Sequence, residues 1–312
     1  MTSERLNPTG EIMEHEGQRI GVIGIGLMGH GIANNIQKSG RALSFLDHPG
    51  NQTVDTLIED GAKSYGTCKE LADECEVIIL CVTGSPQVED VLLSDQGVLN
   101  DLRAGSVIID CSTAIPSSTI AIAETVAAKG GRFLDAPMTR TPKEAAEGRL
   151  NLIVGGDRSL FEEQLPLLES FSENITYAGP AGSGHKLKLL HNFVSLGFSA
   201  VLAEAAACAD RSGVEANVLV EVLANGGGAG AILQRLQPYI LERDSSGFNF
   251  SMSNAHKDIG YYLAMVEAVD ASHTVADGIF GTLDSAVEAG FEQTSIPELI
   301  TILNERGGSL SK

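Results

Sequence analysis

Six short apolar runs, each followed by a stretch with helical spacing, dominate the first 180 residues of the chain. They are rich in Val and Ile and continuous rather than alternating, and they read RIGVIGIG (from Arg19), ALSFLD (from Ala42), EVIILCV (from Glu76), SVIIDCS (from Ser106), RFLDAP (from Arg132) and LNLIVGG (from Leu150). Such runs are typical of strands buried on both faces of a mostly parallel sheet. The intervening segments, such as PSSTIAIAETVAAKG, start with Ser or Thr and end with Gly, as helices do. The pattern therefore predicts an α/β domain with a doubly wound sheet.

The pattern changes after Gly184, where no further run indicates a strand. Long Ala- and Leu-rich stretches are separated there by SGVEAN, ANGGGAG and RDSSGF, which predicts an all-helical second domain. We expect a flexible tail over residues 1–18, a dinucleotide-binding Rossmann domain over 19–182 and a helical domain over 183–312. A ligand site between two such domains is expected in their cleft.

Composition narrows the class of protein. The chain has 312 residues and a formal net charge of −20, so its surface repels nucleic acid. The five cysteines are scattered without a CxxC pair, and the first seventeen residues lack an apolar core, which favours a reduced, cytoplasmic protein without a signal peptide or a metal site. The most apolar stretch, from Asn192, is interrupted by Ser195, Ser199 and Glu204, so we expect a buried core helix rather than a membrane span.

A glycine motif follows the first apolar run. Gly24, Gly26 and Gly29 form G-x-G-x-x-G, and a helical pattern ending at Gly40 follows. In a dinucleotide fold the first glycine allows a tight turn, the second lets the backbone approach a pyrophosphate, and the third lets helix and strand pack closely. Leu27 and Met28, inside the motif, belong to the same predicted cofactor site. The alternative is a glycine-rich turn that binds nothing.

An acidic residue ends the second apolar run. Asp47 lies eighteen residues after Gly29, where a carboxylate accepts hydrogen bonds from the ribose hydroxyls of NAD and repels the extra phosphate of NADP. The next residues, HPGNQ, contain no arginine to receive that phosphate, so we expect NAD as the cofactor. The alternative is that Asp47 caps the next helix.

A polar stripe marks the helix that opens the second domain. Lys188, Asn192, Ser195 and Ser199 fall at i, i+4, i+7 and i+11, on one helical face, although residues 189–203 carry no formal charge. Polar groups on a buried face need partners, and a ligand supplies them. A lysine there donates a proton and holds an anion, and burial lowers its pKa. The alternative is an ordinary lysine whose ammonium reaches water.

With these pieces placed, the chain resembles the β-hydroxyacid dehydrogenases, a family that includes 3-hydroxyisobutyrate dehydrogenase and tartronate semialdehyde reductase. The resemblance covers nearly everything from Arg19 onward. It is carried by GIGLMGHGIANNI, DAPMTRTPKEAAEGRLNLIVGG, GPAGSGHKLKLLHNF and HKDIGYYL, in that order and spacing. It implies a Rossmann domain, a long helix that begins near Gly184, and a helical domain that commonly pairs subunits, so we expect a homodimer or homotetramer.

The resemblance also implies roles for matching positions. The family's catalytic lysine matches Lys188 and its neighbouring asparagine matches Asn192. The lysine of its KDL-type motif, which lies by cofactor and substrate, matches Lys257. The Ser and Thr of its cofactor loop match Ser112 and Thr113. His191 stands where many members have an asparagine, and its role is left open.

One loop departs from the commonest family pattern. Most members have a serine and two glycines in the loop DAPVSGG, whose backbone holds a substrate carboxylate, and this chain has Thr139, Arg140 and Thr141 at those places. An arginine followed by threonine resembles the 3-sulfolactaldehyde reductases, and Ser195 also matches that branch. Two positions differ from it, since Thr139 replaces a glycine and Pro142 replaces a serine.

We therefore expect Arg140 to grip the acid group of the substrate, because its planar fork holds two oxygens of a carboxylate or sulfonate. Thr139 and Thr141 add hydroxyl donors, and Ser195 holds the same anionic end. The alternative is an outward-folded arginine paired with Glu144 or Glu147.

These residues predict NAD(H)-dependent interconversion of a small anionic β-hydroxy acid and its semialdehyde, with Lys188 exchanging the proton and Asn192 orienting it. The favoured substrate pair is 3-sulfolactaldehyde and 2,3-dihydroxypropane-1-sulfonate. The alternatives are 3-hydroxyisobutyrate, another β- or ω-hydroxycarboxylate, and a dinucleotide-binding sensor without turnover.

Overall fold

The structure, a computed structural model, describes residues 17–306. The predicted tail lies outside the described residues up to residue 16. The chain divides into two compact units, Met1–His185 and Lys186–Lys312.

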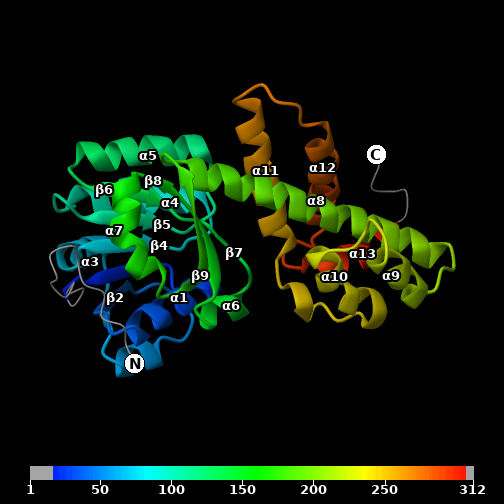
Figure 1. The fold of residues 1–312 in the computed structure, drawn as a ribbon, viewed down its shortest axis with the longest axis horizontal. Coiled ribbons are helices and arrows are strands. Elements are labelled where there is room, and N and C mark those ends of the chain that lie inside the picture. The colour runs from blue at the N-terminus through cyan, green and yellow to red at the C-terminus, as the bar shows by residue number, and fades with distance from the viewer. Residues whose placement is uncertain (1–16, 307–312) are drawn as a thin grey trace. The chain divides into compact units, whose positions relative to one another are not determined.

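In the described part of the first unit, strands β1 to β9 form one sheet (Figure 1). Their bounds are β1 Ile20–Ile23, β2 Leu43–Leu46, β3 Lys63–Tyr65, β4 Val77–Leu80, β5 Val107–Asp110, β6 Arg132–Asp135, β7 Met138–Thr139, β8 Leu150–Gly156 and β9 Ser172–Gly179. The strand order is β3-β2-β1-β4-β5-β6-β8-β7, with β9 beside β8. Neighbours from β3 to β6 are parallel, whereas β8 runs antiparallel to β6 and β7.

The six predicted runs correspond to β1, β2, β4, β5, β6 and β8. In β1, β4 and β5 every residue is buried, as expected for strands covered on both faces. The predicted doubly wound α/β class is confirmed, and three further strands, β3, β7 and β9, were not predicted.

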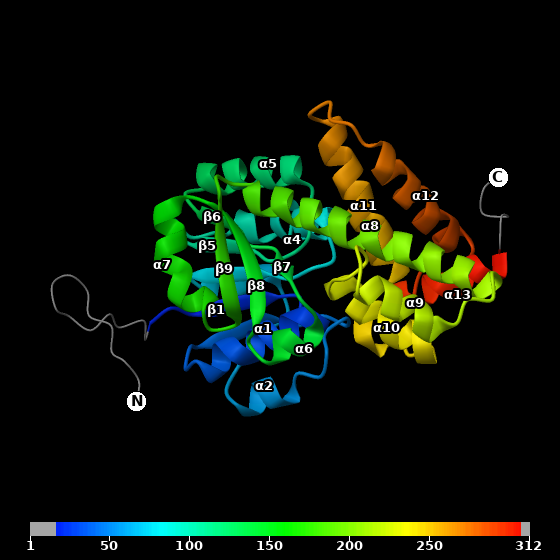
Figure 2. The same ribbon diagram turned by 45° about the vertical axis from the view of Figure 1, so that its right-hand side comes forward.

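Two layers of helices cover the sheet. One face carries α1 (Leu27–Lys38), α2 (Asp55–Glu59), α6 (Pro142–Ala146) and α7 (Arg158–Leu168). The other carries α3 (Cys68–Glu74), α4 (Ser85–Leu93), α5 (Pro116–Ala128) and a 3-10 turn at Val98–Asn100. Figure 2 shows α5 on one side of the sheet and α1 and α2 on the other. Each layer has its own apolar core against the sheet, which fixes the strands that carry the predicted cofactor residues.

The second unit is helical, as predicted. Its helices are α8 (Ser183–Arg211, which begins in the first unit), α9 (Ala216–Ala224), α10 (Ala231–Glu242), α11 (Met252–Glu267), α12 (Thr274–Glu288) and α13 (Leu299–Arg306), with 3-10 turns at Ser246–Phe248 and Ile296–Glu298. Figure 2 shows α11 and α12 lying beside each other as a hairpin. A core drawn from all six helices holds this unit together, and Phe193 of α8 stacks on Tyr262 of α11 with ring centroids 4.2 Å apart.

Helix α8 buries one face and exposes apolar side chains on another. Leu189 and Leu196 are buried, whereas Val194 and Val201 are 69% and 61% exposed. The expected burial of this uncharged helix is therefore incomplete. By length and composition α8 is also the one described helix apolar enough to cross a membrane, a test that core helices of soluble proteins pass as well, and half of its most apolar window is buried.

Candidate active site

The glycine loop between β1 and α1 is shaped as the three predicted roles require. Gly24 has a φ of +97°, and a Cβ there would lie 2.3 Å from the carbonyl oxygen of Cys81. A Cβ at Gly29 would lie 1.9 Å from the carbonyl oxygen of Gly24. A Cβ at Gly26 meets no atom of the described chain within 4 Å. The first and third glycines thus serve the turn and the packing, and the second leaves open space in front of the backbone.

Helix α1 starts in this open space. Gly26 is its N-cap and supplies no side-chain bond to the first turn. The backbone N–H groups of Leu27, Met28 and Gly29 have no acceptor within the helix, and they lie at the positive end of its dipole. These donors beside a glycine cradle fit a pyrophosphate, as in other dinucleotide-binding loops.

The predicted cofactor residues Asp47, Ser112 and Thr113 lie at the same edge of the sheet, because parallel strands end together. Asp47 directly follows β2 and is exposed, while Ser112 and Thr113 follow β5. Asp47 does not cap the next helix, since α2 starts at Asp55 with Val54 as its N-cap. The capping alternative for Asp47 is therefore wrong, and its carboxylate is exposed at this edge of the sheet.

Ser112 is buried and links two loops of this edge. Its hydroxyl accepts a hydrogen bond from the backbone N–H of Val82, after β4, at 3.0 Å. Its own N–H donates to Asp110 Oδ1 at 2.9 Å. Thr113 is half-buried beside it.

The predicted acid-group loop follows β7 and is internally bonded. Thr139 Oγ1 accepts a hydrogen bond from Asn151 Nδ2 at 3.1 Å. Thr141 caps α6 in a capping box with Glu144. Arg140 donates to the backbone carbonyl of Arg149 and pairs with Glu173 on β9, rather than with Glu144 or Glu147.

Arg140 also has an unusual backbone. Its φ of +84° lies in the left-handed region, which favours glycine and costs a residue with a Cβ about 1 kcal/mol. Glycine, the residue that the resemblance implies at this place, is the one that suits this conformation without strain. The Arg140 side chain is 24% exposed and that of Glu173 is 46% exposed, and ion pairs that reach solvent contribute little to stability.

The acid-group loop and the glycine loop are joined by packing of α6 on α1. A Cβ at Gly31 of α1 would lie 2.5 Å from the carbonyl carbon of Ala145 in α6. Asn35 Nδ2 of α1 donates to the carbonyl oxygen of Ala145 at 2.9 Å. The loop that carries Arg140 is therefore anchored to the helix that starts at the predicted phosphate site.

In the second unit, a buried carboxylate brings the predicted lysine and asparagine residues together. Asp258 of α11 is 3% exposed, and its Oδ2 accepts a hydrogen bond from Asn192 Nδ2 of α8 at 2.6 Å. Its Oδ1 accepts one from Lys257 Nζ at 2.7 Å. Lys257 also lies over the ring of Tyr261, 5.0 Å from its centroid. Asn192 can face a carboxylate only with its amide nitrogen, so Asp258 fixes the orientation of that amide.

Lys188 lies one helical turn before Asn192 and is half-buried. Burial is the main cause that lowers the pKa of Lys188 to about 8; the charge of Asp258 opposes this shift, and the charge of Lys257 adds a smaller lowering. A lysine that titrates near neutral pH exchanges protons readily in either direction.

The rest of the polar stripe finds partners inside the chain. His191 Nδ1 lies 3.0 Å from Asn192 Oδ1, and an amide oxygen only accepts, so Nδ1 carries the proton. Ser195 and Ser199 donate to carbonyl oxygens of their own helix, those of Asn192 and Ser195, at 3.3 and 2.8 Å. Ser195 and Ser199 therefore do not require a ligand to satisfy their hydroxyl groups, contrary to the prediction. Lys188 and Asn192 remain as the candidate residues for the chemistry.

Asp258 was missed by the sequence reasoning because it follows Lys257 and reads as half of a surface ion pair. The signal was nevertheless present. Ala255, Ile259 and Tyr262 form the buried stripe of α11, and Asp258 falls on the same face. A carboxylate within an apolar stripe indicates a buried partner.

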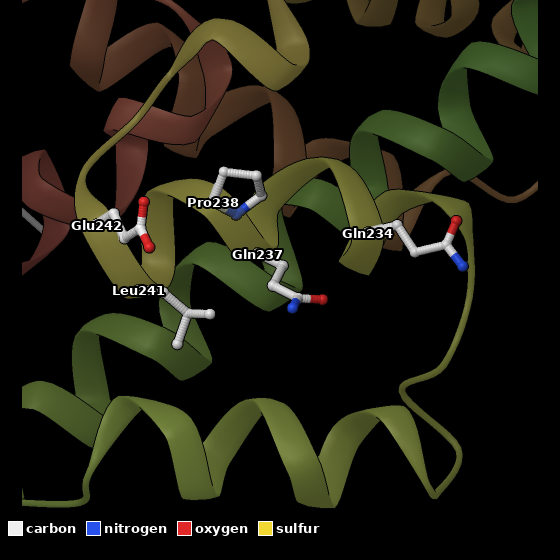
Figure 3. A pocket seen from close by; sticks show the side chains of 5 residues that line it. All are labelled: Gln234, Gln237, Pro238, Leu241 and Glu242. Carbon is white, nitrogen blue, oxygen red and sulfur yellow. The ribbon is translucent and has the colours of Figure 1, made fainter.

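Two cavities in the described part of the chain are lined by none of these residues. One, of about 360 Å³, is lined by Gln234, Gln237, Pro238, Leu241 and Glu242, all on α10, and Figure 3 shows Gln237 and Leu241 extending to the same side of that helix. The other lies over α5, β6 and α7. Within residues 17–306, no three His, Cys, Asp or Glu side chains are grouped as metal ligands are.

Comparison with known proteins shows the family to which the chain belongs. Residues 19–179 match the model for the NAD-binding domain of 6-phosphogluconate dehydrogenase. Residues 182–303 match the model for the NAD-binding region of NADP-dependent 3-hydroxyisobutyrate dehydrogenase. The 3-hydroxyisobutyrate dehydrogenase of Pseudomonas aeruginosa is 32% identical over 259 residues, which cover 81% of this chain and 87% of that protein. The chain belongs to the β-hydroxyacid dehydrogenase family.

The chain is also similar to proteins with other names and to a solved structure. The NAD-dependent L-serine dehydrogenase of P. aeruginosa is 32% identical over 78% of this chain and 83% of its own length. The cytokine-like nuclear factor N-PAC of Homo sapiens is 28% identical over 81% of this chain, but the chain spans only 45% of that protein's length. A crystal structure of 3-hydroxyisobutyrate dehydrogenase from Salmonella typhimurium, 24% identical, has the same fold with a TM-score of 0.80 over 92% of this chain and all of that one.

Proposed function

We propose that the protein is an NAD(H)-dependent oxidoreductase that interconverts a small anionic β-hydroxy acid and its semialdehyde. The observation that carries the proposal is the half-buried Lys188, whose pKa is lowered to about 8 beside the buried pair of Asn192 and Asp258. Bound NADH supplies the hydride of such a reaction. The glycine cradle and the uncapped start of α1 fit its pyrophosphate.

The residues of the second unit handle the proton. Lys188, as an ammonium, donates a proton to the oxygen of the carbonyl being reduced, and in the reverse direction its amine takes the proton from the hydroxyl. Asn192, with its amide nitrogen held by Asp258, has one N–H and one oxygen lone pair left to orient the lysine and that oxygen. Lys257 adds positive charge for an anionic cofactor or substrate.

A sharp test replaces the lysine. Lys188→Ala is expected to lose at least about a hundredfold in kcat while its Kd for NADH changes little, because general acid–base catalysis contributes about 10²–10⁴. Lys186→Ala is the matched control, since Lys186 is exposed on the same helix and points to the opposite side. Near-normal turnover of Lys188→Ala would refute the assignment.

The rival proposal is a dinucleotide-binding protein without turnover. One relative, N-PAC, is named as a nuclear factor rather than a dehydrogenase, so family membership alone leaves this reading open. Lys188, Asn192 and Asp258 argue for catalysis, because binding a dinucleotide does not require a lysine that titrates near neutral pH. Substrate-dependent NADH consumption by the purified protein would exclude the rival.

For the cofactor, we propose a preference for NAD over NADP. Asp47 is exposed at the end of β2, where it accepts from a ribose hydroxyl and repels a 2′-phosphate. Titration of the protein with NADH and NADPH tests this, and Asp47→Ala is expected to narrow the difference in Kd. Equal affinity of the wild type for both would overturn the preference.

For the substrate, we propose that Arg140 leaves Glu173 to bind the acid group, either the sulfonate of 3-sulfolactaldehyde or a carboxylate. Relatives named for L-serine and 3-hydroxyisobutyrate support the carboxylate. The arginine at a glycine place supports the sulfonate. A panel of 3-hydroxyisobutyrate, L-serine, glycerate, 4-hydroxybutyrate and 2,3-dihydroxypropane-1-sulfonate, assayed on wild type and Arg140→Gly, decides between them. Loss of only the sulfonate activity in the variant favours the sulfonate, and unchanged activities leave Arg140 no role in binding.

A further inference from the structure

A cluster of buried polar side chains in the first unit has no role in the proposed chemistry. His185 and Asp135 are fully buried, and Asp110 and Thr119 are 1% exposed. Two carboxylates and an imidazole inside a protein cost much solvation energy unless they are paired and hydrogen-bonded. The hydrogen bonds of these side chains show which parts of the fold they hold in place.

Asp135, at the end of β6, holds the first turn of α8. Its Oδ1 accepts a hydrogen bond from Gly182 N at 2.8 Å, and its Oδ2 accepts one from His185 N at 2.9 Å. These N–H groups precede and open a 29-residue helix, so the carboxylate also meets the positive end of its dipole. A Cβ at Gly184 would lie 2.8 Å from Asp135 Oδ2, so the contact has no room for a larger residue.

The His185 ring is held at both nitrogens. Its Nε2 lies 3.1 Å from the carbonyl oxygen of Ser112, which only accepts, so Nε2 carries a proton and donates it. Its Nδ1 lies 2.8 Å from Thr119 Oγ1 on α5. Asp110 Oδ2 and Asp135 Oδ2 are each 3.9 Å from a ring nitrogen. The ring therefore has one orientation, set by α5 and by the ends of β5 and β6.

The peptide groups of Ser112 are the point where this cluster reaches the predicted cofactor edge. Asp110 Oδ1 accepts from Ser112 N at 2.9 Å, and His185 donates to Ser112 O. The Ser112 hydroxyl in turn accepts from Val82 N, which fixes the loop after β4. The loops after β4 and β5 and the first turn of α8 are thus tied through one imidazole.

We propose that His185 is a positioning residue, which holds the Ser112–Thr113 loop in its cofactor-binding geometry and sets the start of the helix that carries Lys188 three residues later. The relevance to turnover rests on the proposed function, whereas the effect on NADH binding does not require it. His185, together with Asp110, Asp135 and Thr119, acts through Ser112 and touches no reacting atom.

The test uses two matched threonine variants and two histidine variants that remove all or part of the hydrogen bonding of the ring. Thr119→Val removes the hydroxyl that meets His185 Nδ1. Thr125→Val removes a hydroxyl on the same helix that makes the same bond to the carbonyl four residues earlier but does not meet His185. His185→Phe removes both ring nitrogens, and His185→Gln restores one N–H toward Ser112 O. The measurements are the Kd for NADH, kcat and the thermal midpoint of each variant.

Thr119→Val is expected to weaken NADH binding about fivefold, the usual value of one hydrogen bond, while Thr125→Val leaves the Kd unchanged. His185→Phe is expected to weaken it more, and His185→Gln is expected to recover part of the loss. If Thr119→Val and His185→Gln lower only the thermal midpoint and match Thr125→Val in Kd, the cluster is merely structural and the inference is wrong. Absence of turnover in the wild type on every substrate refutes the proposed function instead, and the Kd series still decides the role of His185.

Discussion

At the scale of single residues, the proposed chemistry depends on the pKa of Lys188. Asp258 raises the pKa of Lys188, and burial and Lys257 lower it, so its value near 8 is a balance. Burial lowers the pKa of His191, and the charges of Lys188 and of Arg235 on α10 add to that lowering. A change of one charge in this group therefore moves the working range of the lysine.

This balance predicts the pH dependence of both directions. Below about pH 8 Lys188 is an ammonium and serves as the acid, so kcat/KM for reduction falls as pH rises through about 8. For oxidation the amine is the active form, so kcat/KM rises through the same range. Asp258→Asn removes the charge that raises the pKa and is expected to shift both profiles to lower pH.

The control for that shift is Asp210→Asn, which removes an equal charge from a pair with Arg243 near the other end of α8, about 33 Å along the helix from Lys188. Its profiles are expected to coincide with those of the wild type. Profiles of Asp258→Asn that also coincide would show that Asp258 does not act on the lysine.

Arg140 gives a second prediction at this scale. Arg140→Gly and Arg140→Ala both lose the exposed pair with Glu173, but only glycine suits a φ of +84°. The glycine variant is expected to be more stable than the alanine variant by about 1 kcal/mol. Urea unfolding of the two proteins measures this, and equal stabilities would mean that the backbone at this position relaxes in solution.

The sequence indicated Lys188 and Asn192 as candidate site residues but did not indicate Asp258. Lys188 and Asn192 were visible because a polar stripe is conspicuous in an uncharged helix. Asp258 was not, because its partner Asn192 is 66 residues away in sequence. Nothing in the sequence predicted that Arg140 would pair with Glu173, since that contact depends on β9, a strand that the apolar pattern did not show.

At the scale of secondary-structure elements, the turn from β1 to α1 contains one glycine that the fold requires and another that the fold does not require. A methyl group at Gly29 would meet the Gly24 carbonyl at 1.9 Å, whereas one at Gly26 would meet only open space in the described chain. Gly26 also has an ordinary φ of −78° that alanine adopts without strain. Gly29 is therefore required for packing within the turn, whereas Gly26 leaves space for a ligand.

We predict that Gly26→Ala keeps the thermal midpoint of the wild type but binds NADH at least about tenfold more weakly, because the methyl group occupies the space of the pyrophosphate. Gly29→Ala is expected to lose both stability and binding. Fluorescence titration and thermal unfolding separate the two effects. Tight NADH binding by Gly26→Ala would show that the cofactor does not approach this turn.

The missed strands share a physical cause. The pattern of continuous apolar runs detects strands covered on both faces, and β3, with Lys63 and Ser64 exposed, is not one of them. Strand β7 has only two residues, and β9 reads SENITYAG with several exposed positions. Edge and antiparallel strands carry a mixed pattern that a search for buried parallel strands does not find.

At the scale of the whole molecule, the exposed face of α8 bears on assembly. Leu187, Leu190, Val194 and Val201 fall at i, i+3, i+7 and i+14, so they line one face, and all four are exposed. A stripe of this kind suits the homodimer or homotetramer that we propose. The net charge of −20 opposes association, and salt screens that repulsion.

We predict that Val194→Asp with Val201→Asp lowers the molar mass measured by light scattering, because two carboxylates in an apolar interface are costly to desolvate. Val269→Asp is the control, since Val269 is 70% exposed beyond the end of α11, outside the stripe. An unchanged mass for the double variant would place the subunit interface elsewhere.

The position of β7 in the sheet has an evolutionary consequence. This two-residue strand ends the strand order and pairs with β8 only at Met138 and Thr139, directly before Arg140. Substitutions in the loop that follows disturb little of the parallel sheet that carries the nucleotide residues. We therefore expect the acid group that is recognised to vary more readily among diverging lineages than the nucleotide-binding edge of the sheet. The names of three relatives, which refer to serine, hydroxyisobutyrate and hydroxymethylglutarate, agree with that expectation.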